Sequence, residues 1–422
     1  MKILLDKGFI GFKFQTISTK FGFHFQQIPD IHFIMNKGKY VFSQVIEFLS
    51  HNDFIRCVSK YDGNYKVKSF ACWHQLLYMV FGQLSNRDSL SDLIVCLQSQ
   101  KNKSYHLGMG KGTSKSNLAK ANEKRDYRIY EEFASILVKQ AQSLLTPNTS
   151  LDVDVDGSVY AIDATVVDLC LELFWWGKFR KHKAAVKLHT MLDVNTQIPT
   201  FVHITSGAVH EVNAMDIFPI ESGSYYVMDK GYTDFGRLHH IHQSDAFFVT
   251  RARENFTFIR LTSRTVDKNS GLRCDQTVRL KNYKVSLSYP EAMRRIKFYD
   301  NDSHNEFVFI TNNFEISALD VARLYKYRWT IELFFKWIKQ HLKIKSFWGY
   351  SMNAVKIQVY IAIITYLLVA IVKHELKLKQ TQYEILQVLS ISLLCKTPLQ
   401  ELFSISYPQY VKEQNTNQLN LF

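Results

Sequence analysis

The amino-acid sequence predicts an α/β protein in which helices flank a mixed β-sheet, with an α-helical N-terminal domain and a β-rich insertion. Apolar residues recur at helical spacing in the first third of the chain. Short runs of β-branched and aromatic residues, separated by turn residues, follow between residues 159 and 250. Two longer helical patterns cover residues 317–342 and 354–376. Strands that alternate with helices are typical of a sheet covered by helices.

The composition is that of a folded, basic protein. The 422 residues include 52 Lys and Arg against 38 Asp and Glu, a formal net charge of +14, and 46% are apolar. This length is typical of two or three domains. The positive surplus favours a polyanionic partner, either nucleic acid or an anionic membrane surface. The longest apolar run, residues 359–372, is shorter than the ~20 residues of a membrane-spanning helix, so we expect no membrane partner.

The six cysteines and the N-terminus bear on the cellular compartment. The cysteines form no C-x2-C pair, which argues against a zinc site or a disulfide framework. The first residues show no small-residue cleavage site of the kind that ends a secretory signal. We therefore expect a cytoplasmic protein.

The first 148 residues divide into an extension and a helical domain. Residues 1–34 are aromatic and basic without a clear helical or strand periodicity. They are either a flexible N-terminal arm or the result of a start codon upstream of Met35. Residues 35–148 follow helical spacing. Within them, one helix is expected to begin after Ser114 or Ser116, either of which can cap it, and to run to Leu137.

A strongly basic segment, residues 101–125, carries seven Lys and Arg against one acid. Two explanations stay open for it. It is either a solvated linker with a charged helix surface or a DNA-contacting element like a helix-turn-helix. In the second case Lys115 and Lys120 bind phosphates, Asn117 reaches a base edge, and residues 35–148 form a DNA-binding domain.

Strand-like runs after Pro147 predict the sheet. They cover residues 159–167, 185–192, 200–205, 225–228 and 246–250, with a helix at 233–242 before the last of them. A polar, alternating region with a hairpin of residues 295–299 and 306–311 follows. We therefore assign residues 149–250 and 314–378 to the core, 251–313 to a β-rich insertion and 379–422 to a C-terminal helical tail.

Basic residues are also frequent in residues 178–189, where two explanations again stay open. The segment is either a solvent-facing strand edge or part of a DNA groove in which Lys187 and its neighbours neutralise phosphates.

The helical pattern at 317–342 places its polar residues on one side. Ser317, followed three residues later by Asp320, is a start like a capping box. On a helical wheel with about 100° per residue, the polar side chains lie within an arc of roughly 80°. They are Tyr325, Arg328, Glu332, Lys336, Lys339 and Lys343. The other sides are apolar, which is typical of a helix buried except for one polar stripe.

A single glutamate among cations on such a helix has two explanations. In the first, Arg328, Glu332 and Lys336 form an internal ladder of ion pairs four residues apart. In the second, the positive surplus binds phosphates while Glu332 holds a metal ion. The second explanation requires more carboxylates, and the strands supply them.

Asp163 lies inside the strand at 159–167 and Asp229 ends the strand at 225–228, at positions where the apolar pattern would not place an acid. Carboxylates on neighbouring strands that face a third one on a helix form an all-oxygen site suited to Mg²⁺ or Mn²⁺. Two such ions activate a water or a 3′-hydroxyl and stabilise the leaving oxygen in phosphodiester cleavage.

A competing motif overlaps this strand. Asp152, Asp154, Asp156 and Gly157, with Asp163 last, reproduce the spacing of a calcium loop. The residues after Asp163 are strand-like where an EF-hand requires a helix. An acidic, solvated turn before the first core strand is therefore the preferred explanation.

The spacing Tyr325-x2-Arg328-x3-Glu332-x6-Lys339 resembles the Y-R-E-K signature of bacterial cut-and-paste DDE transposases encoded by insertion sequences. Asp163 and Asp229 resemble the first and second acids of that family. The resemblance covers roughly residues 159–348. It implies an RNase H-like fold with a β-rich insertion between the second and third acids.

For the site, the resemblance implies that Asp163, Asp229 and Glu332 are catalytic and hold two Mg²⁺ or Mn²⁺ ions. It also implies that Tyr325, Arg328 and Lys339 contact phosphates of the transposon end and hold a flipped nucleotide. Lys336 and Lys343 are expected to add phosphate contacts. No Trp lies between Trp176 and Trp329, so stacking on the flipped base either falls to Phe298, Tyr299 or Phe314 or is absent.

For the protein, the resemblance implies a DNA transposase that binds inverted-repeat ends, cleaves them with divalent metal ions and transfers the 3′-OH ends into target DNA. It implies a synaptic homodimer acting near the nucleoid in the bacterial cytoplasm. Two other functions stay open. One is a non-catalytic DNA-binding regulator derived from a transposase, and the other is an RNase H-like nuclease without strand transfer.

Overall fold

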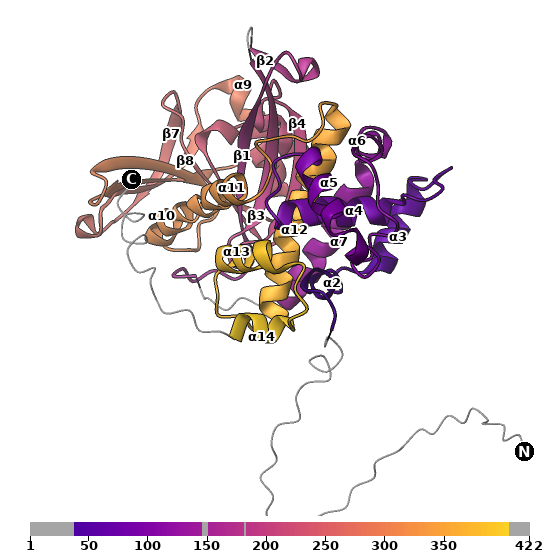
Figure 1. Ribbon diagram of the computed structural model, residues 1–422. Coiled ribbons are helices and arrows are strands. Elements are labelled where there is room, and N and C mark those ends of the chain that lie inside the picture. Colours follow the sequence, from indigo (N-terminus) through magenta and orange to yellow (C-terminus); the bar gives the residue numbers. More distant parts are fainter. Residues whose placement is uncertain (1–37, 146–150, 181–182, 405–422) are drawn as a thin grey trace, which may run out of the picture.

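The computed structural model describes residues 38–145, 151–180 and 183–404, so the extension expected over residues 1–34 lies outside the described residues. Helices make up the described chain before the sheet, strands dominate from Val159 to Thr311, and helices return from Ala318 onward (Figure 1). The helical parts pack against the sheet, as the α/β prediction requires.

The N-terminal helices form a bundle in which α4 (Cys72–Leu84) is buried along almost its whole length. The other helices of the bundle are α2 (Val41–Ile46), α3 (His51–Lys60), α5 (Leu90–Ser99), α6 (Lys115–Lys124) and α7 (Arg128–Leu144). The side chain of Ser114 accepts a hydrogen bond from the Asn117 amide and caps α6. The single helix expected to run on to Leu137 is wrong, because the backbone is extended at Arg125 and α7 begins anew.

One ten-stranded sheet has the order β2-β3-β1-β5-β6-β10-β9-β8-β7, with β4 paired to β3. Its first six strands are β1 (Val159–Leu169), β2 (Lys178–Arg180), β3 (Lys183–Asp193), β4 (Pro199–Ser206), β5 (Tyr225–Met228) and β6 (Phe247–Arg251). β1 is antiparallel to β3 and parallel to β5, and β5 is parallel to β6. Helix α8 (Phe235–Gln243) connects β5 to β6. This mixed sheet, flanked by helices, confirms the predicted fold class and is consistent with an RNase H-like core.

The expected insertion extends the same sheet and does not form a separate layer. Its strands are β7 (Phe258–Arg264), β8 (Leu272–Leu280), β9 (Met293–Asp300) and β10 (Asn305–Thr311), with the short helix α9 (Tyr283–Ser286) between β8 and β9. The predicted hairpin corresponds to β9 and β10, and β10 also pairs with β6. Because an exposed edge of β6 would leave backbone groups unpaired, this pairing completes the core sheet.

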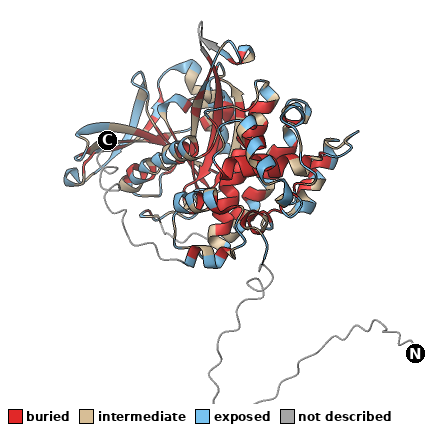
Figure 2. Cartoon of the chain, in the orientation of Figure 1, coloured by how far each residue is buried: buried red, intermediate tan, exposed pale blue. Residues whose placement is uncertain are grey.

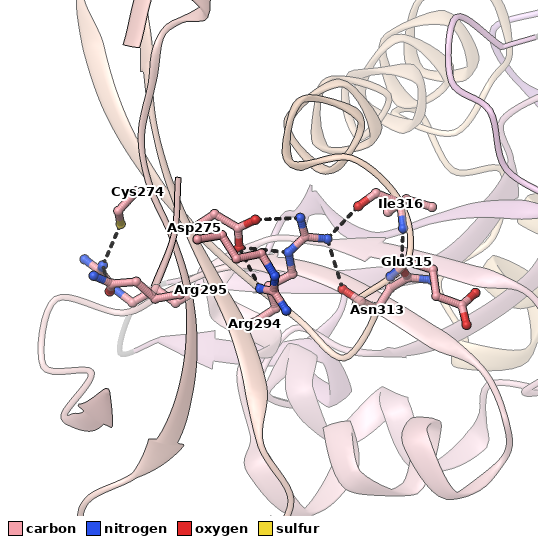
Figure 3. Close-up of polar contacts among 9 residues, drawn as sticks. Cys274, Asp275, Arg294, Arg295, Asn313, Glu315 and Ile316 are labelled. Carbon is pink, nitrogen blue, oxygen red and sulfur yellow. Dashed lines mark hydrogen bonds and ion pairs between the residues drawn. The ribbon is translucent and has the colours of Figure 1, made fainter. Parts of the chain in front are cut away.

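A buried ion pair connects the insertion to the helices that follow it (Figure 3). Arg294 on β9 donates to both carboxylate oxygens of Asp275 on β8, at 2.9 and 2.8 Å. The same guanidinium donates to the backbone oxygens of Ile316, at 2.6 Å, and Asn313, at 3.5 Å. Since these two residues precede the next helix, Arg294 links strands β8 and β9 to the start of that helix.

The helix expected over residues 317–342 is two helices, α10 (Ala318–Lys326) and α11 (Trp329–His341). Between them, the Tyr327 and Arg328 amides donate to carbonyls three residues back, so the backbone tightens to a 3₁₀-like turn. The apolar sides of α11 are not all buried, contrary to the expectation, since Trp329 is 41% and Leu333 52% exposed. Ser317 caps α10 as expected, by accepting from the Asp320 amide.

Helix α12 (Met352–Glu375) confirms the helix expected over residues 354–376, and it is the one helix of the described chain with the length and composition of a membrane span. Of its most apolar window, 94% is buried inside the protein. It packs against α4, α6, α7 and α13 (Gln382–Ser392), and Figure 2 shows that buried residues are concentrated where the N-terminal helices meet the rest of the protein. This is the environment of a core helix. α14 (Leu399–Ser404) ends the described part of the C-terminal segment.

Candidate active site

Strands β1 and β5 place Asp163 and Asp229 next to each other. The parallel register pairs Ala161 with Val227 and Ile162 with Met228, so the two aspartates follow at the next position of each strand. Side chains alternate between the faces of a sheet, which puts these two carboxylates on the same face. That face is covered by α11, which contacts β1.

Glu332 on α11 is connected to Asp163 by Arg328. The Arg328 Nη1 atom lies 2.5 Å from Glu332 Oε1 and 3.8 Å from Asp163 Oδ2. The guanidinium is mostly buried, so this contact with two carboxylates is only weakly screened by water. The structure thus brings together three of the predicted site residues from β1, the α10–α11 turn and α11. The ion pair between Arg328 and Glu332 is the first part of the ladder considered above.

Burial raises the pKa of the Asp163 carboxyl from its ordinary value of 3.8 to about 6. A hydrogen bond from the Ala164 amide and the charge of Arg328 act in the opposite direction, while Glu332 and Glu211 raise the pKa further. The raised pKa therefore comes mainly from the removal of water around the carboxyl group.

Asp229 lies at the end of β5, where its carboxylate accepts a hydrogen bond from the Lys230 amide. Its charge reaches Tyr325 on α10, whose pKa is raised mainly by burial and further by Asp229. The Tyr325 ring packs against Phe309 of β10, with ring centroids 4.9 Å apart, and Arg328 lies over the ring at 5.8 Å. Tyr325 and Asp229 therefore belong to the same cluster as Arg328.

The three lysines predicted on the polar stripe have different surroundings. Lys336 is exposed on α11. The half-buried Lys339 donates to the backbone oxygen of Val166 at 2.9 Å, and burial lowers the pKa of its ammonium group. Lys343 lies after the end of α11 and forms an ion pair with Asp88 at 2.7 Å, so it joins the segment after α11 to the N-terminal part of the chain and is not presented to solvent as a phosphate contact.

The expectation that Lys187 contacts DNA phosphates is contradicted by its burial. Its Nζ atom donates to the Val209 oxygen at 2.9 Å and lies 3.3 Å from Glu211 Oε1. The ammonium group is therefore already paired inside the protein. The sequence could not reveal this ion pair, because Glu211 lies 24 residues after Lys187 in a segment without a clear helical or strand pattern.

The predicted DNA contacts of the N-terminal part lie on α6. Lys115, Asn117 and Lys120 are exposed there, and Asn117 Nδ2 donates to the Thr113 hydroxyl at 2.9 Å. The helix packs against α5 and α12, and it lies apart from the acids on β1, β5 and α11 (Figure 1). The structure therefore presents two separate groups of candidate DNA contacts.

Two residues beside the acids were not among the predicted ones. Glu211 opens the 3₁₀ helix η3 (Glu211–Ile217), and Tyr232 closes the 3₁₀ helix η4 (Lys230–Tyr232) that follows Asp229. Asp163, Glu211 and Asp229 all raise the pKa of Tyr232, in addition to its burial. The Tyr232 hydroxyl has no hydrogen-bond partner among the described residues. In the sequence, the position of Tyr232 three residues after Asp229 could have identified it as a neighbour of the acids.

The donor set fits a hard divalent cation in its chemistry, since all the candidate ligands are carboxylate oxygens. In the described part of the chain, no three acidic, His or Cys side chains already surround one point closely enough to hold a metal ion. Arg328 supplies positive charge between Glu332 and Asp163 instead. One oxygen of Glu332, Oε1, is therefore paired with Arg328 in this structure. The calcium-loop alternative fails, because Asp163 is followed by strand and not by helix.

Comparison with known proteins finds related families for two parts of the chain. The family model of the transposase DDE domain matches residues 155–368, and that of a domain of unknown function (DUF4372) matches residues 37–110. A Sinorhizobium fredii protein, named as a candidate transposase y4zB, is 31% identical over 297 residues, 69% of this chain and 80% of its own length.

Two further relatives carry insertion-sequence names. The probable transposase for insertion sequence element IS5377 of Geobacillus stearothermophilus is 27% identical over 52% of this chain and 58% of its own length. A Synechocystis protein named as a candidate transposase for insertion sequence element IS4SA is 24% identical over 71% of this chain and 81% of its own length. The matched DDE region contains β1, β5 and α11, which carry the three acids. The chain belongs to the DDE transposases of bacterial insertion sequences and is an enzyme that acts on DNA.

Proposed function

We propose that this transposase binds the inverted-repeat ends of its element, cleaves them by divalent-metal-dependent hydrolysis, and transfers the freed 3′-OH ends into target DNA. The observation that supports it best is the convergence of Asp163, Asp229 and Glu332, from two adjacent parallel strands and the helix that covers them. Phosphoryl transfer depends on positioning and charge neutralisation more than on covalent chemistry by the protein.

Asp163, Asp229 and Glu332 are the proposed ligands of two Mg²⁺ or Mn²⁺ ions. Bound ions supply an activated water or 3′-hydroxyl and neutralise charge on the leaving oxygen. Asp163 gives up its proton more readily once a cation is present, since burial is the main reason for its raised pKa. Arg328, released from Glu332, becomes available to a DNA phosphate close to the acids.

The same proposal assigns DNA contacts to two surfaces. Next to the acids, Tyr325, Arg328, Lys336 and Lys339 contact the phosphates of the transposon end, as the Y-R-E-K resemblance implies. On α6, the exposed Lys115, Asn117 and Lys120 contact end DNA farther from the cut. Two ends must be cut and joined together, so we propose a homodimer in the synaptic complex, acting in the bacterial cytoplasm.

A plasmid that carries the two ends of the element tests the proposal. Wild-type protein should cleave at the ends with Mg²⁺ or Mn²⁺ and join them to target DNA, and EDTA should stop both reactions. Glu332→Gln should lower cleavage at least 10³-fold, because the isosteric amide cannot supply the negative charge, while end binding measured by gel shift changes little. Glu375→Gln, which alters an exposed acid on α12, is the matched control and should cut normally.

Three outcomes would decide against the proposal. Near wild-type cleavage by Glu332→Gln would remove Glu332 from the metal site. Cleavage without strand joining would favour the RNase H-like nuclease. End binding without any metal-dependent cleavage by the wild type would favour the non-catalytic regulator.

A further inference from the structure

We propose that Thr190 is a positioning residue for Asp163, the first of the three acids. Its buried hydroxyl donates a hydrogen bond to the ionised Asp163 carboxylate and holds that carboxylate in the orientation that cleavage requires. The inference rests on the proposed metal-dependent function and deepens it. It is carried by the sheet register, by the burial of Thr190 and by the small number of donors around Asp163.

The sheet register places Thr190 beside Asp163. Thr190 on β3 is the residue directly opposite Asp163 on β1 in the antiparallel pairing. Directly opposed side chains lie on the same face of a sheet, with Cβ atoms about 4.5–5.5 Å apart. A threonine hydroxyl and an aspartate carboxylate span this separation with one hydrogen bond after rotation of the side chains. Helix α11, which carries Glu332, contacts both strands.

Thr190 is buried without a hydrogen-bond partner. The residue is 1% exposed, and its Oγ1 atom makes no hydrogen bond within the part of the chain that the structure describes. Its neighbours in register and along the strand are Asp163, Val202, Leu188 and Leu192, of which only the first is polar. Since a buried hydroxyl without a partner costs stability, the Asp163 carboxylate is the natural acceptor for it.

The Asp163 carboxylate in turn has few donors. Among the described residues it accepts one hydrogen bond, from the Ala164 amide to Oδ1 at 2.8 Å. The Arg328 Nη1 atom lies 3.8 Å from Oδ2, which is beyond hydrogen-bond distance. A buried carboxylate is costly to ionise unless its oxygens are satisfied. Thr190 is therefore placed to supply a second donor when Asp163 is ionised for the reaction.

A hydrogen bond from Thr190 fixes the direction in which the Asp163 oxygens point. Asp163 is a proposed ligand of a cation, so one of its oxygens must be held at a defined place. Groups that hydrogen-bond to a metal-binding carboxylate orient it, and their removal typically lowers metal affinity or activity about 10- to 100-fold. Thr190 acts through Asp163 and itself contacts neither DNA nor the cation.

Thr190→Val tests the hydroxyl, because valine has nearly the same shape and lacks the donor. Cleavage of bound transposon ends, measured in a single turnover with enzyme in excess, should slow about tenfold, while end binding measured by gel shift changes little. The melting temperature in EDTA should not fall, since the substitution removes a hydroxyl that has no partner among the described residues.

Thr190→Ser is the conservative variant. It keeps the hydroxyl and loses one buried methyl group, so it should melt at a lower temperature than the wild type. Its rate of end cleavage should nevertheless stay close to that of the wild type, because serine can donate to Asp163 in the same way.

Thr365→Val on α12 is the matched control. Thr365 is also fully buried, but its hydroxyl donates to the Ile361 oxygen at 2.8 Å, within a helix that carries none of the three acids. The same substitution at this site should leave end cleavage at the wild-type rate.

The two Thr190 variants separate positioning from packing. If Thr190 positions Asp163, Thr190→Val cleaves more slowly than Thr190→Ser, while the melting temperatures follow the opposite order. Wild-type cleavage by Thr190→Val would overturn the inference. A Thr190→Ser variant as slow as Thr190→Val would overturn it too, since the buried methyl group and not the hydroxyl would then be needed.

The failure of this inference differs from the failure of the proposed function. If the wild type does not cleave transposon ends with Mg²⁺ or Mn²⁺, the proposed function fails. If the wild type cleaves them and Thr190→Val cleaves equally fast, the inference about Thr190 alone is wrong.

Discussion

At the residue scale, the ionised Asp163 carboxylate destabilises the folded protein because it is buried. Its carboxyl is mostly buried, and its pKa rises from 3.8 to about 6, mainly through that burial. A raised pKa means that the folded state binds this proton more tightly than the unfolded state does. The corresponding stability is fully present below pH 3.8 and is lost as the pH rises through about 6.

Asp163→Asn should therefore stabilise the metal-free protein at neutral and alkaline pH, although it should abolish the proposed cleavage. We expect a gain of roughly 2 kcal/mol in the free energy of unfolding at pH 8, and little gain at pH 4. Urea unfolding in EDTA at the two pH values measures it. Asp216→Asn, at an exposed acid, should show no such gain, and an Asp163→Asn variant no more stable than the wild type at pH 8 would contradict the prediction.

At the scale of elements, the ion pair between β8 and β9 links the sheet to the segment that precedes α10. Asp275 contacts two arginines, Arg294, which is 4% exposed, and Arg264, which is 40% exposed. Arg294 alone also donates to the backbone before α10 (Figure 3). The two arginines thus share an acid but differ in burial, which makes them a matched pair for mutation.

Arg294→Leu should lower the free energy of unfolding by about 3 kcal/mol, because it leaves the buried Asp275 carboxylate without its main partner and Ile316 without a donor. Arg264→Ala should cost less than about 1 kcal/mol, since an exposed ion pair is screened by water. Chemical denaturation of both variants provides the comparison. Equal losses would show that burial does not decide the strength of these two pairs.

The elements also show where sequence patterns are sufficient. The strand at residues 225–228 was predicted with its observed bounds, because every side chain in it is buried and the run is unbroken. The division between α10 and α11 was not predicted, since Tyr327 and Arg328 are neither Gly nor Pro and remain in the right-handed helical region. At this turn Arg328 contacts Asp163 on β1, and a helical wheel does not contain contacts with other elements.

At the scale of the whole molecule, α12 joins the N-terminal helices to the rest. It packs against α4, α6 and α7, and one continuous hydrophobic cluster includes buried residues from these helices, from the sheet and from α11. The N-terminal helices therefore bury much of their apolar surface against a segment more than 200 residues away.

A fragment of residues 38–145 should consequently not fold cooperatively by itself, whereas residues 38–404 should. Without α12, the apolar sides of α4 and α7 are exposed to water, and the loss of burial exceeds the few kcal/mol by which a domain of this size is stable. Thermal unfolding followed by circular dichroism, together with limited proteolysis, measures both fragments. A sharp unfolding transition of the 38–145 fragment would show that it is an independent domain.

The sequence by itself determined the fold class, most of the strands and the three candidate acids, because alternation, apolar runs and misplaced charges are local properties. The tertiary structure alone decided the partners of the charges. Lys187 is paired with Glu211, Lys343 with Asp88, and Arg328 with both Asp163 and Glu332. The physical reason is that the energy of a charge depends on its burial and on which elements meet around it, and neither quantity is contained in spacing along the chain.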